Sequence, residues 1–272
     1  MVPVLFSIGG LDIQTYGLSK GLAAVVAAWL LGRAFDGLGL RRDDAHSLVI
    51  WATVWGFVGA KIYFLLEHLG SLTPHSFGNS GFTWYGGVVG GVTAAGVIMR
   101  RRSLPALPVA GAAMIPLSIA YGIGRIGCWL SGDGTSGTPT SLPWGMPAVH
   151  GAAPTDVAVH PTGLYEAIGA FAIAATLWGL QRRGAGAVDM IAWYLLLSGT
   201  ARFAVEFIRT NTPVVVGLTQ PQLWAAASVV AGIGLLAIAR ARARHAHPSS
   251  NLNETPVSPA GLPVDTGDDA DL

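Results

Sequence analysis

The chain has 272 residues, of which 51% are hydrophobic and only 11% are charged, and its net charge is +1. A soluble protein carries about 25% charged residues, so this chain has too few charges to cover a globular surface in water. The composition excludes a soluble globular protein and is typical of a protein with several membrane spans, whose expected partners are membrane lipids and not nucleic acid. The single cysteine, Cys128, excludes an internal disulfide and a metal site built from several thiolates.

Seven segments approach the roughly 20 apolar residues that a membrane-spanning helix needs. Several are rich in glycine and alanine, which membrane helices use for close packing. We therefore predict an all-α, polytopic membrane protein with seven transmembrane helices. The expected spans are residues 15–35, 46–68, 84–99, 107–130, 162–180, 188–208 and 218–239.

Arginines are concentrated in the connections after the first, third and fifth spans and in the segment after the seventh. The loops after the second and fourth spans contain no lysine or arginine. Because basic residues are retained on the cytoplasmic side, this pattern predicts an outer N-terminus and a cytoplasmic C-terminus. The basic residues concerned are Arg33, Arg41, Arg42, Arg100, Arg101, Arg102, Arg182, Arg183, Arg240, Arg242 and Arg244.

Two segments outside the spans have distinct compositions. The loop from Ser131 to Pro161 is long, poor in charge and rich in glycine and proline, and we expect it to form a small functional cap on the outer side. Residues 245–272 contain proline, serine, asparagine and five acids with few large apolar residues. We therefore predict a membrane domain over residues 1–244 and a disordered acidic cytoplasmic tail over residues 245–272.

The first two spans each carry one polar side chain near the outer end, and each could lie at the membrane interface or contact a lipid. Tyr16 opens the first span, where a tyrosine is by default part of the aromatic belt at the membrane interface. Lys61 lies late in the second span. Its ammonium group either contacts a lipid phosphate or extends along the helix to the interface, and both interpretations remain open.

The third span begins with a tyrosine followed by paired glycines. Gly86 with Gly90, and Gly87 with Gly91, form two overlapping GxxxG pairs that let a neighbouring helix backbone approach closely. Tyr85 is the one candidate chemical group in this run.

Charged side chains late in the fourth and sixth spans need a physical reason, because an arginine in lipid is costly unless it faces a polar cavity or a partner. Arg125 is late in the fourth span, and Arg202, Glu206 and Arg209 are spaced i, i+4 and i+7 in the sixth, on one helix face. Three arginines against one glutamate favour an anionic ligand such as a lipid head group. In the alternative, Arg202 and Glu206 only neutralise each other while Arg209 extends to the interface.

The fifth span opens with the segment HPTGLYE at residues 160–166. Pro161 suits the first turn of a helix, and Glu166 lies close enough to the N-terminus to interact favourably with the helix dipole. Capping does not explain His160 or Tyr165 at this depth. His160 is the most plausible group to titrate near neutral pH on the outer side, and the alternative is an ordinary interfacial histidine.

Six motifs in this chain resemble those of the bacterial prolipoprotein diacylglyceryl transferases and occur in that family's order. Any one of them is weak evidence, whereas six in order on a seven-span pattern are strong. The motifs are YGL at 16–18, YGG at 85–87, GRIGC at 124–128, HPTxLYE at 160–166, RFxxEFxR at 202–209 and GLTxxQ at 217–222.

The resemblance implies an enzyme of the bacterial cytoplasmic (inner) membrane. The enzyme would transfer the diacylglyceryl group of phosphatidylglycerol to the lipobox cysteine of a prolipoprotein signal peptide, forming a thioether and releasing glycerol phosphate. Neither the resemblance nor the residue pattern implies a metal, nucleotide or redox cofactor.

The resemblance and the residue patterns together suggest which side chains act. Arg125 and Arg202 would hold the phosphate and stabilise it as it leaves, while Glu206 would orient the arginines. The peptide thiol needs a base or a positive field to become a thiolate. Catalytic roles are expected for Arg125, Arg202, Glu206, His160 and Tyr85. Substrate-binding roles are expected for Tyr16, Lys61, Gly86, Gly87, Ser131, Gly132, Gly137, Tyr165, Glu166 and Arg209.

The chain departs from the family pattern at four places. Many members have a histidine, the usual candidate base, where Tyr85 stands, so His160, Tyr85 with a lowered pKa, or the arginine field alone would have to assist the thiol here. Ser131 replaces an asparagine before Gly132, Ser198 a common tyrosine, and Ala112 a frequent aspartate. A paralogue with another acceptor therefore remains an alternative. A lipid-binding or transport protein is a third, although we find no repeated halves.

Overall fold

The computed structural model describes residues 1–9, 11–78 and 81–246, and in this part of the chain seven α-helices follow one another. Each lies within a few residues of a predicted span, so the mostly helical, multi-pass class is confirmed. The first two residues of the expected tail, 245 and 246, belong to α7 instead, and the rest of it, from position 247 onward, lies outside the described residues. The helices are α1 (Thr15–Gly37), α2 (Arg42–Glu67), α3 (Trp84–Arg101), α4 (Ala106–Ser131), α5 (Thr162–Arg182), α6 (Ala187–Glu206) and α7 (Gln220–Ala246), with short 3₁₀ turns η1 (Leu69–Ser71) and η2 (Pro74–Phe77) after α2.

Six of the described helices, all except α3, are long and apolar enough to cross a membrane. The exception has 18 residues and ends in Arg100 and Arg101. Large apolar side chains on the lateral surface of the bundle, such as Val25, Ile168 and Val230, are exposed. A soluble protein rarely exposes apolar surface on this scale, so these faces are suited to lipid.

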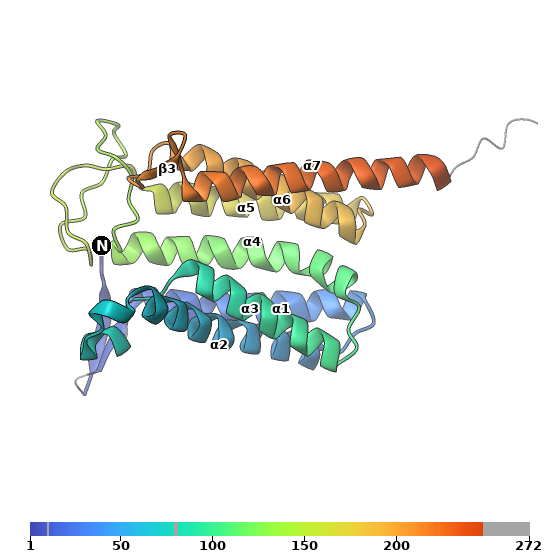
Figure 1. The fold of residues 1–272 in the computed structure, drawn as a ribbon, viewed down its shortest axis with the longest axis horizontal. Helices are drawn as coiled ribbons and strands as arrows, with labels where there is room; N and C mark the ends of the chain where they lie inside the picture. The colour runs from blue at the N-terminus through green and yellow to red at the C-terminus, as the bar shows by residue number, and fades with distance from the viewer. Residues whose placement is uncertain (10, 79–80, 247–272) are drawn as a thin grey trace, which may run out of the picture.

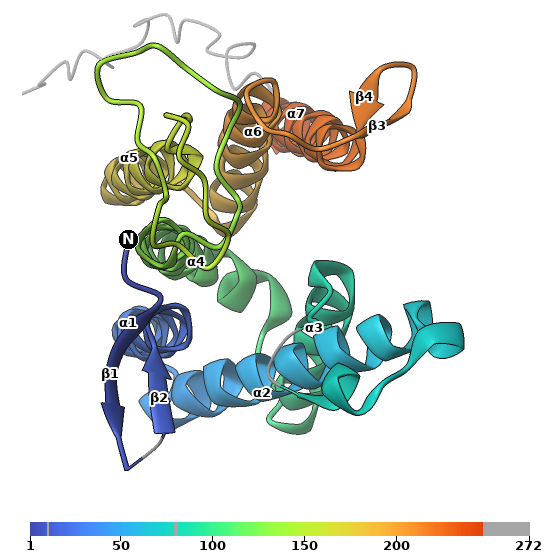
Figure 2. The same ribbon diagram turned by 90° about the vertical axis from the view of Figure 1, so that its left-hand side faces the viewer.

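The helices form two groups joined by α4. Helices α1, α2 and α3 lie on one side and α5, α6 and α7 on the other, as the end-on view shows (Figure 2). Helix α4 contacts α1 as well as α5 and α6. The side view shows the α1–α2, α3–α4 and α5–α6 connections at one end of the bundle, with the loop after α4 at the other (Figure 1).

Glycines bring α2 and α3 into backbone contact. A Cβ atom added to Gly86 would overlap the carbonyl oxygen of Gly59, and one on Gly90 would overlap the carbonyl oxygen of Trp55. The GxxxG pairs at the start of α3 therefore serve helix packing, as their spacing predicts.

The all-α prediction omits two short antiparallel hairpins. Strands β1 (Val4–Ile8) and β2 (Leu11–Gln14) precede α1, and strands β3 (Pro213–Val215) and β4 (Leu218–Thr219) connect α6 to α7. Strands of two to five residues are too short to show a clear alternation of apolar and polar residues, so the sequence pattern did not reveal them.

The turn of the β3–β4 hairpin carries a strained residue, and we expect Val216→Asn to stabilise the protein. Val216 has φ 49° and Gly217 has φ 74°, so both turn residues have positive φ, the arrangement for which Asn-Gly is preferred. A β-branched residue is disfavoured there, and we expect a gain of about 1 kcal/mol in the free energy of unfolding. Thermal unfolding in detergent would measure it. Val214→Asn, on the adjacent exposed strand, is the control, and an equal gain at both positions would contradict the explanation.

Candidate functional site

A cavity of about 730 Å³ lies among the ends of α3, α4, α5, α6 and α7. Most of its polar lining comes from residues that the sequence analysis singled out. Its volume falls in the range of small-molecule sites, about 300–1,000 Å³. The polar and aromatic side chains on its wall are Trp84, Tyr85, Ser118, Tyr121, Arg125, Thr135, Tyr165, Glu166, Tyr194, Ser198, Arg202, Arg209, Trp224 and Ser228.

Glu166 of α5 lies at the centre of three guanidinium groups. Nη1 of Arg202 donates to its Oε1 at 2.5 Å, Nε of Arg125 lies 3.0 Å from its Oε2, and Nη1 of Arg209 lies 3.5 Å from the same oxygen. The hydroxyl of Tyr121 donates to Oε1 at 3.1 Å. The Glu166 side chain is only 4% exposed, so these contacts neutralise a buried carboxylate.

Glu206, the last residue of α6, is the second buried carboxylate of the cluster. Nη2 of Arg202 lies 2.7 Å from its Oε2, and Nε of Arg209 lies 3.7 Å from the same atom. The other oxygen, Oε1, accepts hydrogen bonds from Nδ2 of Asn211 at 2.6 Å and from the hydroxyl of Thr219 at 2.8 Å. Residues at both ends of the β3–β4 hairpin therefore contact Glu206, which in turn contacts the arginines.

The prediction of a single counter-charge is wrong, because Glu166 joins Glu206. Glu166 is the fifth residue of α5, just beyond a first turn that contains no acidic residue, and its carboxylate is paired with arginines of other segments. Three arginines against two glutamates leave an excess of one positive charge. The cluster therefore still favours an anion, though less strongly than three arginines against one glutamate would.

Arg209 reaches the cluster by a route that helical spacing did not predict. Helix α6 ends at Glu206, so Arg209 lies beyond it and not on its face. The segment is held instead by backbone pairing: Arg209 forms a β-bridge with Gly137, and the Thr138 N–H donates to the Ile208 carbonyl at 2.8 Å.

Gly137 is required by this pairing. A Cβ atom at Gly137 would lie 2.5 Å from the carbonyl oxygen of Ile208 and 2.8 Å from Cβ of His160. The loop after α4 thus packs directly on the segment that carries Arg209, and any side chain at position 137 would push them apart.

The two residues considered as proton acceptors have different positions. Tyr85 lies on the cavity wall, whereas His160 does not line it. Nδ1 of His160 lies 3.4 Å from the hydroxyl of Tyr165, which does line the cavity and which also accepts a hydrogen bond from Nε1 of Trp144 at 2.7 Å. His160 is therefore connected to the cavity through Tyr165.

Residues 3–238 match the family model for prolipoprotein diacylglyceryl transferase. The chain belongs to the prolipoprotein diacylglyceryl transferase family.

Curated relatives carry the corresponding name. The chain is 29% identical to the phosphatidylglycerol–prolipoprotein diacylglyceryl transferase of Clostridium tetani, over 77% of this chain and 86% of that protein. It is 30% identical to the Paenarthrobacter aurescens protein of the same name, over 88% of this chain and 82% of that one. A third relative, from Clostridioides difficile, is 27% identical over 85% of this chain and 92% of its own length.

The remaining predicted site residues do not line this cavity. The ring of Tyr16 lies under Nζ of Lys20, which is 4.9 Å from its centroid. Nζ of Lys61 donates to the Gly78 carbonyl at 2.8 Å. Gly86 and Gly87 lie in the α2–α3 contact, where Cβ atoms would meet Gly59 and Gly56 respectively.

Ser131 and Gly132 form the C-terminal end of α4. The Ser131 hydroxyl is buried and donates to the Cys128 carbonyl at 3.1 Å. Gly132 caps the helix in the left-handed region, with φ 60°. In this transferase-family chain the pair shapes the start of the loop after α4, and neither residue lines the cavity.

Two of the other departures from the family pattern are close to the site. Tyr85 and Ser198 both line the cavity. Ala112 instead packs against the apolar cluster that contains Leu31 and Phe35.

One cavity residue that the sequence analysis missed is Tyr121. Its hydroxyl accepts from Nε of Arg125 at 3.0 Å while donating to Glu166. Its position, four residues before Arg125 on the same helix face, was the available signal.

Proposed function

We propose that this chain transfers the diacylglyceryl group of phosphatidylglycerol to the lipobox cysteine of a prolipoprotein, releasing glycerol phosphate. The observation that supports this most directly is the group of Arg125, Arg202 and Arg209, which line one cavity and share the buried carboxylate of Glu166. The family match and the names of the relatives agree with it.

The proposal includes an orientation in the bacterial cytoplasmic membrane. All seven helices span it, and the arginine-rich connections face the cytoplasm. The N-terminus, the loop after α4 and both hairpins then face outward, and the loop covers the site as a small cap. The cavity opens among helix ends at the outer side, where a phosphatidylglycerol head group would lie.

In the proposed reaction the arginines bind the departing group. The sulfur of the acceptor cysteine forms a bond to the terminal glyceryl carbon, and the bond from that carbon to the phosphate oxygen breaks. The electron pair leaves with glycerol phosphate. Arg125 and Arg202, both facing the cavity, would hold the phosphate and stabilise the charge that develops on it. Glu166 and Glu206 would keep the guanidinium groups oriented, and Arg209 would add to the positive field.

The thiol proton must leave before or during the attack. Tyr85 lies on the cavity wall but could accept the proton only as a phenolate, whereas His160 could accept it as a neutral imidazole and would act through Tyr165. The excess positive charge of the arginine cluster would favour the thiolate form of the incoming cysteine.

Complementation tests the proposed function. A bacterium depleted of its own transferase and expressing this chain should survive and accumulate prolipoprotein carrying a thioether-linked diacylglyceryl group, detected by mass spectrometry. If well-expressed protein fails to restore growth and a Tyr85→His variant restores it, the chain is instead a diverged paralogue with another acceptor. If neither grows and no modified lipoprotein forms, the proposed activity is wrong.

A further inference from the structure

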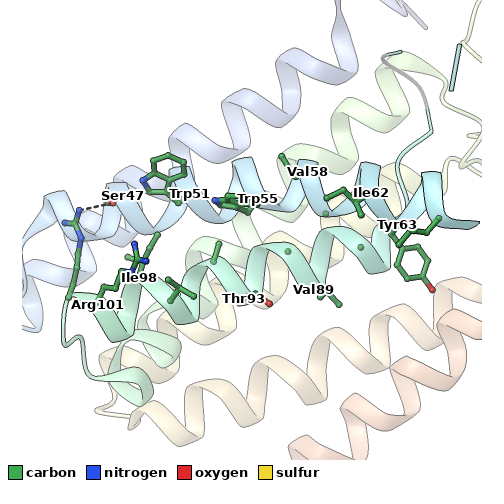
Figure 3. A pocket seen from close by; sticks show the side chains of 17 residues that line it. Ser47, Trp51, Trp55, Val58, Ile62, Tyr63, Val89, Thr93, Ile98 and Arg101 are labelled. Carbon is green, nitrogen blue, oxygen red and sulfur yellow. Dashed lines mark hydrogen bonds between the residues drawn. The ribbon is translucent and has the colours of Figure 1, made fainter. Parts of the chain in front are cut away.

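A second hollow, of about 970 Å³, runs along α2 and α3, and none of its lining residues borders the arginine cavity. Its long sides are mostly apolar: Trp51 and Trp55 line it along α2, and Val89 and Thr93 line it along α3 (Figure 3). We call it the α2–α3 groove. Its floor is formed where glycine backbones meet, since Gly59 and Gly90 both line it and approach each other too closely for side chains.

The charged groups of this groove are concentrated at one end, while its other polar side chains, Thr93 and Tyr63, lie farther along it. Ser47, Arg101 and Arg102 line the end at which α2 begins and α3 finishes. Arg102 pairs with Asp44 and donates to the Ser47 hydroxyl at 3.1 Å. In the described part of the chain, Asp44 is the one carboxylate in an ion pair with the arginines at 100–102, so this end carries an excess of positive charge.

We propose that the α2–α3 groove binds an anionic glycerophospholipid of the cytoplasmic leaflet. Its phosphate would lie beside Arg101 and Arg102, and one acyl chain would lie along Trp51, Trp55 and Thr93. From Ser47 to Trp55 a helix rises about 12 Å, close to the roughly 15 Å that half of the hydrocarbon core measures. A single lipid with one anionic end therefore matches both the length of the groove from Ser47 to Trp55 and the positive charge at its end. The inference rests on the proposed orientation of the bundle but not on the reaction.

Charge argues against two other occupants. A secretory signal peptide has a basic segment before its apolar one, and that segment would meet arginines at this end of the groove. A second copy of this chain inserts in the same direction, so its own arginines would lie at the same membrane depth. Both occupants would place like charges together, whereas an anionic lipid would neutralise the excess charge.

Photo-crosslinking of the full-length protein in nanodiscs tests this. The probe is phosphatidylserine with a diazirine in its acyl chain, compared with the matching phosphatidylcholine probe. We expect phosphatidylserine to label residues 47–55 and 93–98, which line the cytoplasmic half of the groove, preferentially. Arg101→Gln combined with Arg102→Gln should weaken that labelling roughly tenfold or more, because each basic residue near the membrane surface contributes to anionic-lipid binding.

Two further variants make the test specific. Thr93→Trp fills the groove and leaves its arginines in place, and it should also abolish labelling. Arg182→Gln with Arg183→Gln removes two basic residues from the end of α5, which does not line the groove, and should leave labelling unchanged. Equal labelling by both probes, or labelling insensitive to the groove variants, would overturn the proposal. So would a groove that crosslinks to a signal peptide or to a second copy.

Discussion

Replacement of Arg202 by alanine is expected to lower the rate of diacylglyceryl transfer about 10²–10³-fold, the usual cost of removing one group that stabilises developing charge. Arg202 is the one guanidinium group that contacts both carboxylates at hydrogen-bonding distance, 2.5 Å from Glu166 and 2.7 Å from Glu206. Its loss would remove the proposed phosphate contact and would also take one arginine partner from each glutamate. Arg202→Lys should recover little activity, because an ammonium group cannot span two carboxylates and a phosphate as a planar guanidinium does.

Transfer from labelled phosphatidylglycerol to a lipobox peptide in detergent would measure the effect. Arg183→Ala is the control, because this exposed arginine lies just after α5 at the opposite end of the bundle. The proposed role of Arg202 would be wrong if a folded Arg202→Ala protein kept more than about a tenth of the wild-type rate, against the 10²–10³-fold loss expected.

Replacement of Glu166 by glutamine is expected to have the largest effect on stability. The substitution keeps the shape of the side chain but removes the negative charge that three arginines share, so the excess charge of the cluster rises from one to two. Breaking a buried ionic group in this way costs about 3–5 kcal/mol. We expect a large drop in the thermal unfolding temperature and loss of transfer activity.

Glu67→Gln provides the matched control. Glu67 is exposed at the end of α2, where its carboxylate accepts one hydrogen bond from the Thr83 hydroxyl at 3.0 Å, and its replacement should change stability little. Added phosphatidylglycerol should stabilise Glu166→Gln more than it stabilises the wild type, because the variant cluster is more positive. An unfolding temperature equal to that of the wild type would show that Glu166 is not the central counter-charge.

Patterns of short range were sufficient to predict the helices. The apolar segments, their lengths and the glycine pairs at the start of α3 depend on residues that are neighbours along the chain or on one helix face. The same holds for the excess of arginines in alternate connections. Arg125 and Arg202 were identifiable because a charge in an apolar segment demands a partner, even before the partner is known.

The partners themselves were decided only by the tertiary structure. Glu166, from α5, meets arginines of α4, α6 and the following segment because of how those helices cross, and no spacing within α5 encodes that crossing. Arg209 enters the cluster because its backbone pairs with Gly137, more than 70 residues earlier in the sequence. Periodicity in a sequence reports which face of a helix is apolar, whereas the choice of a counter-charge depends on contacts between segments far apart in the chain.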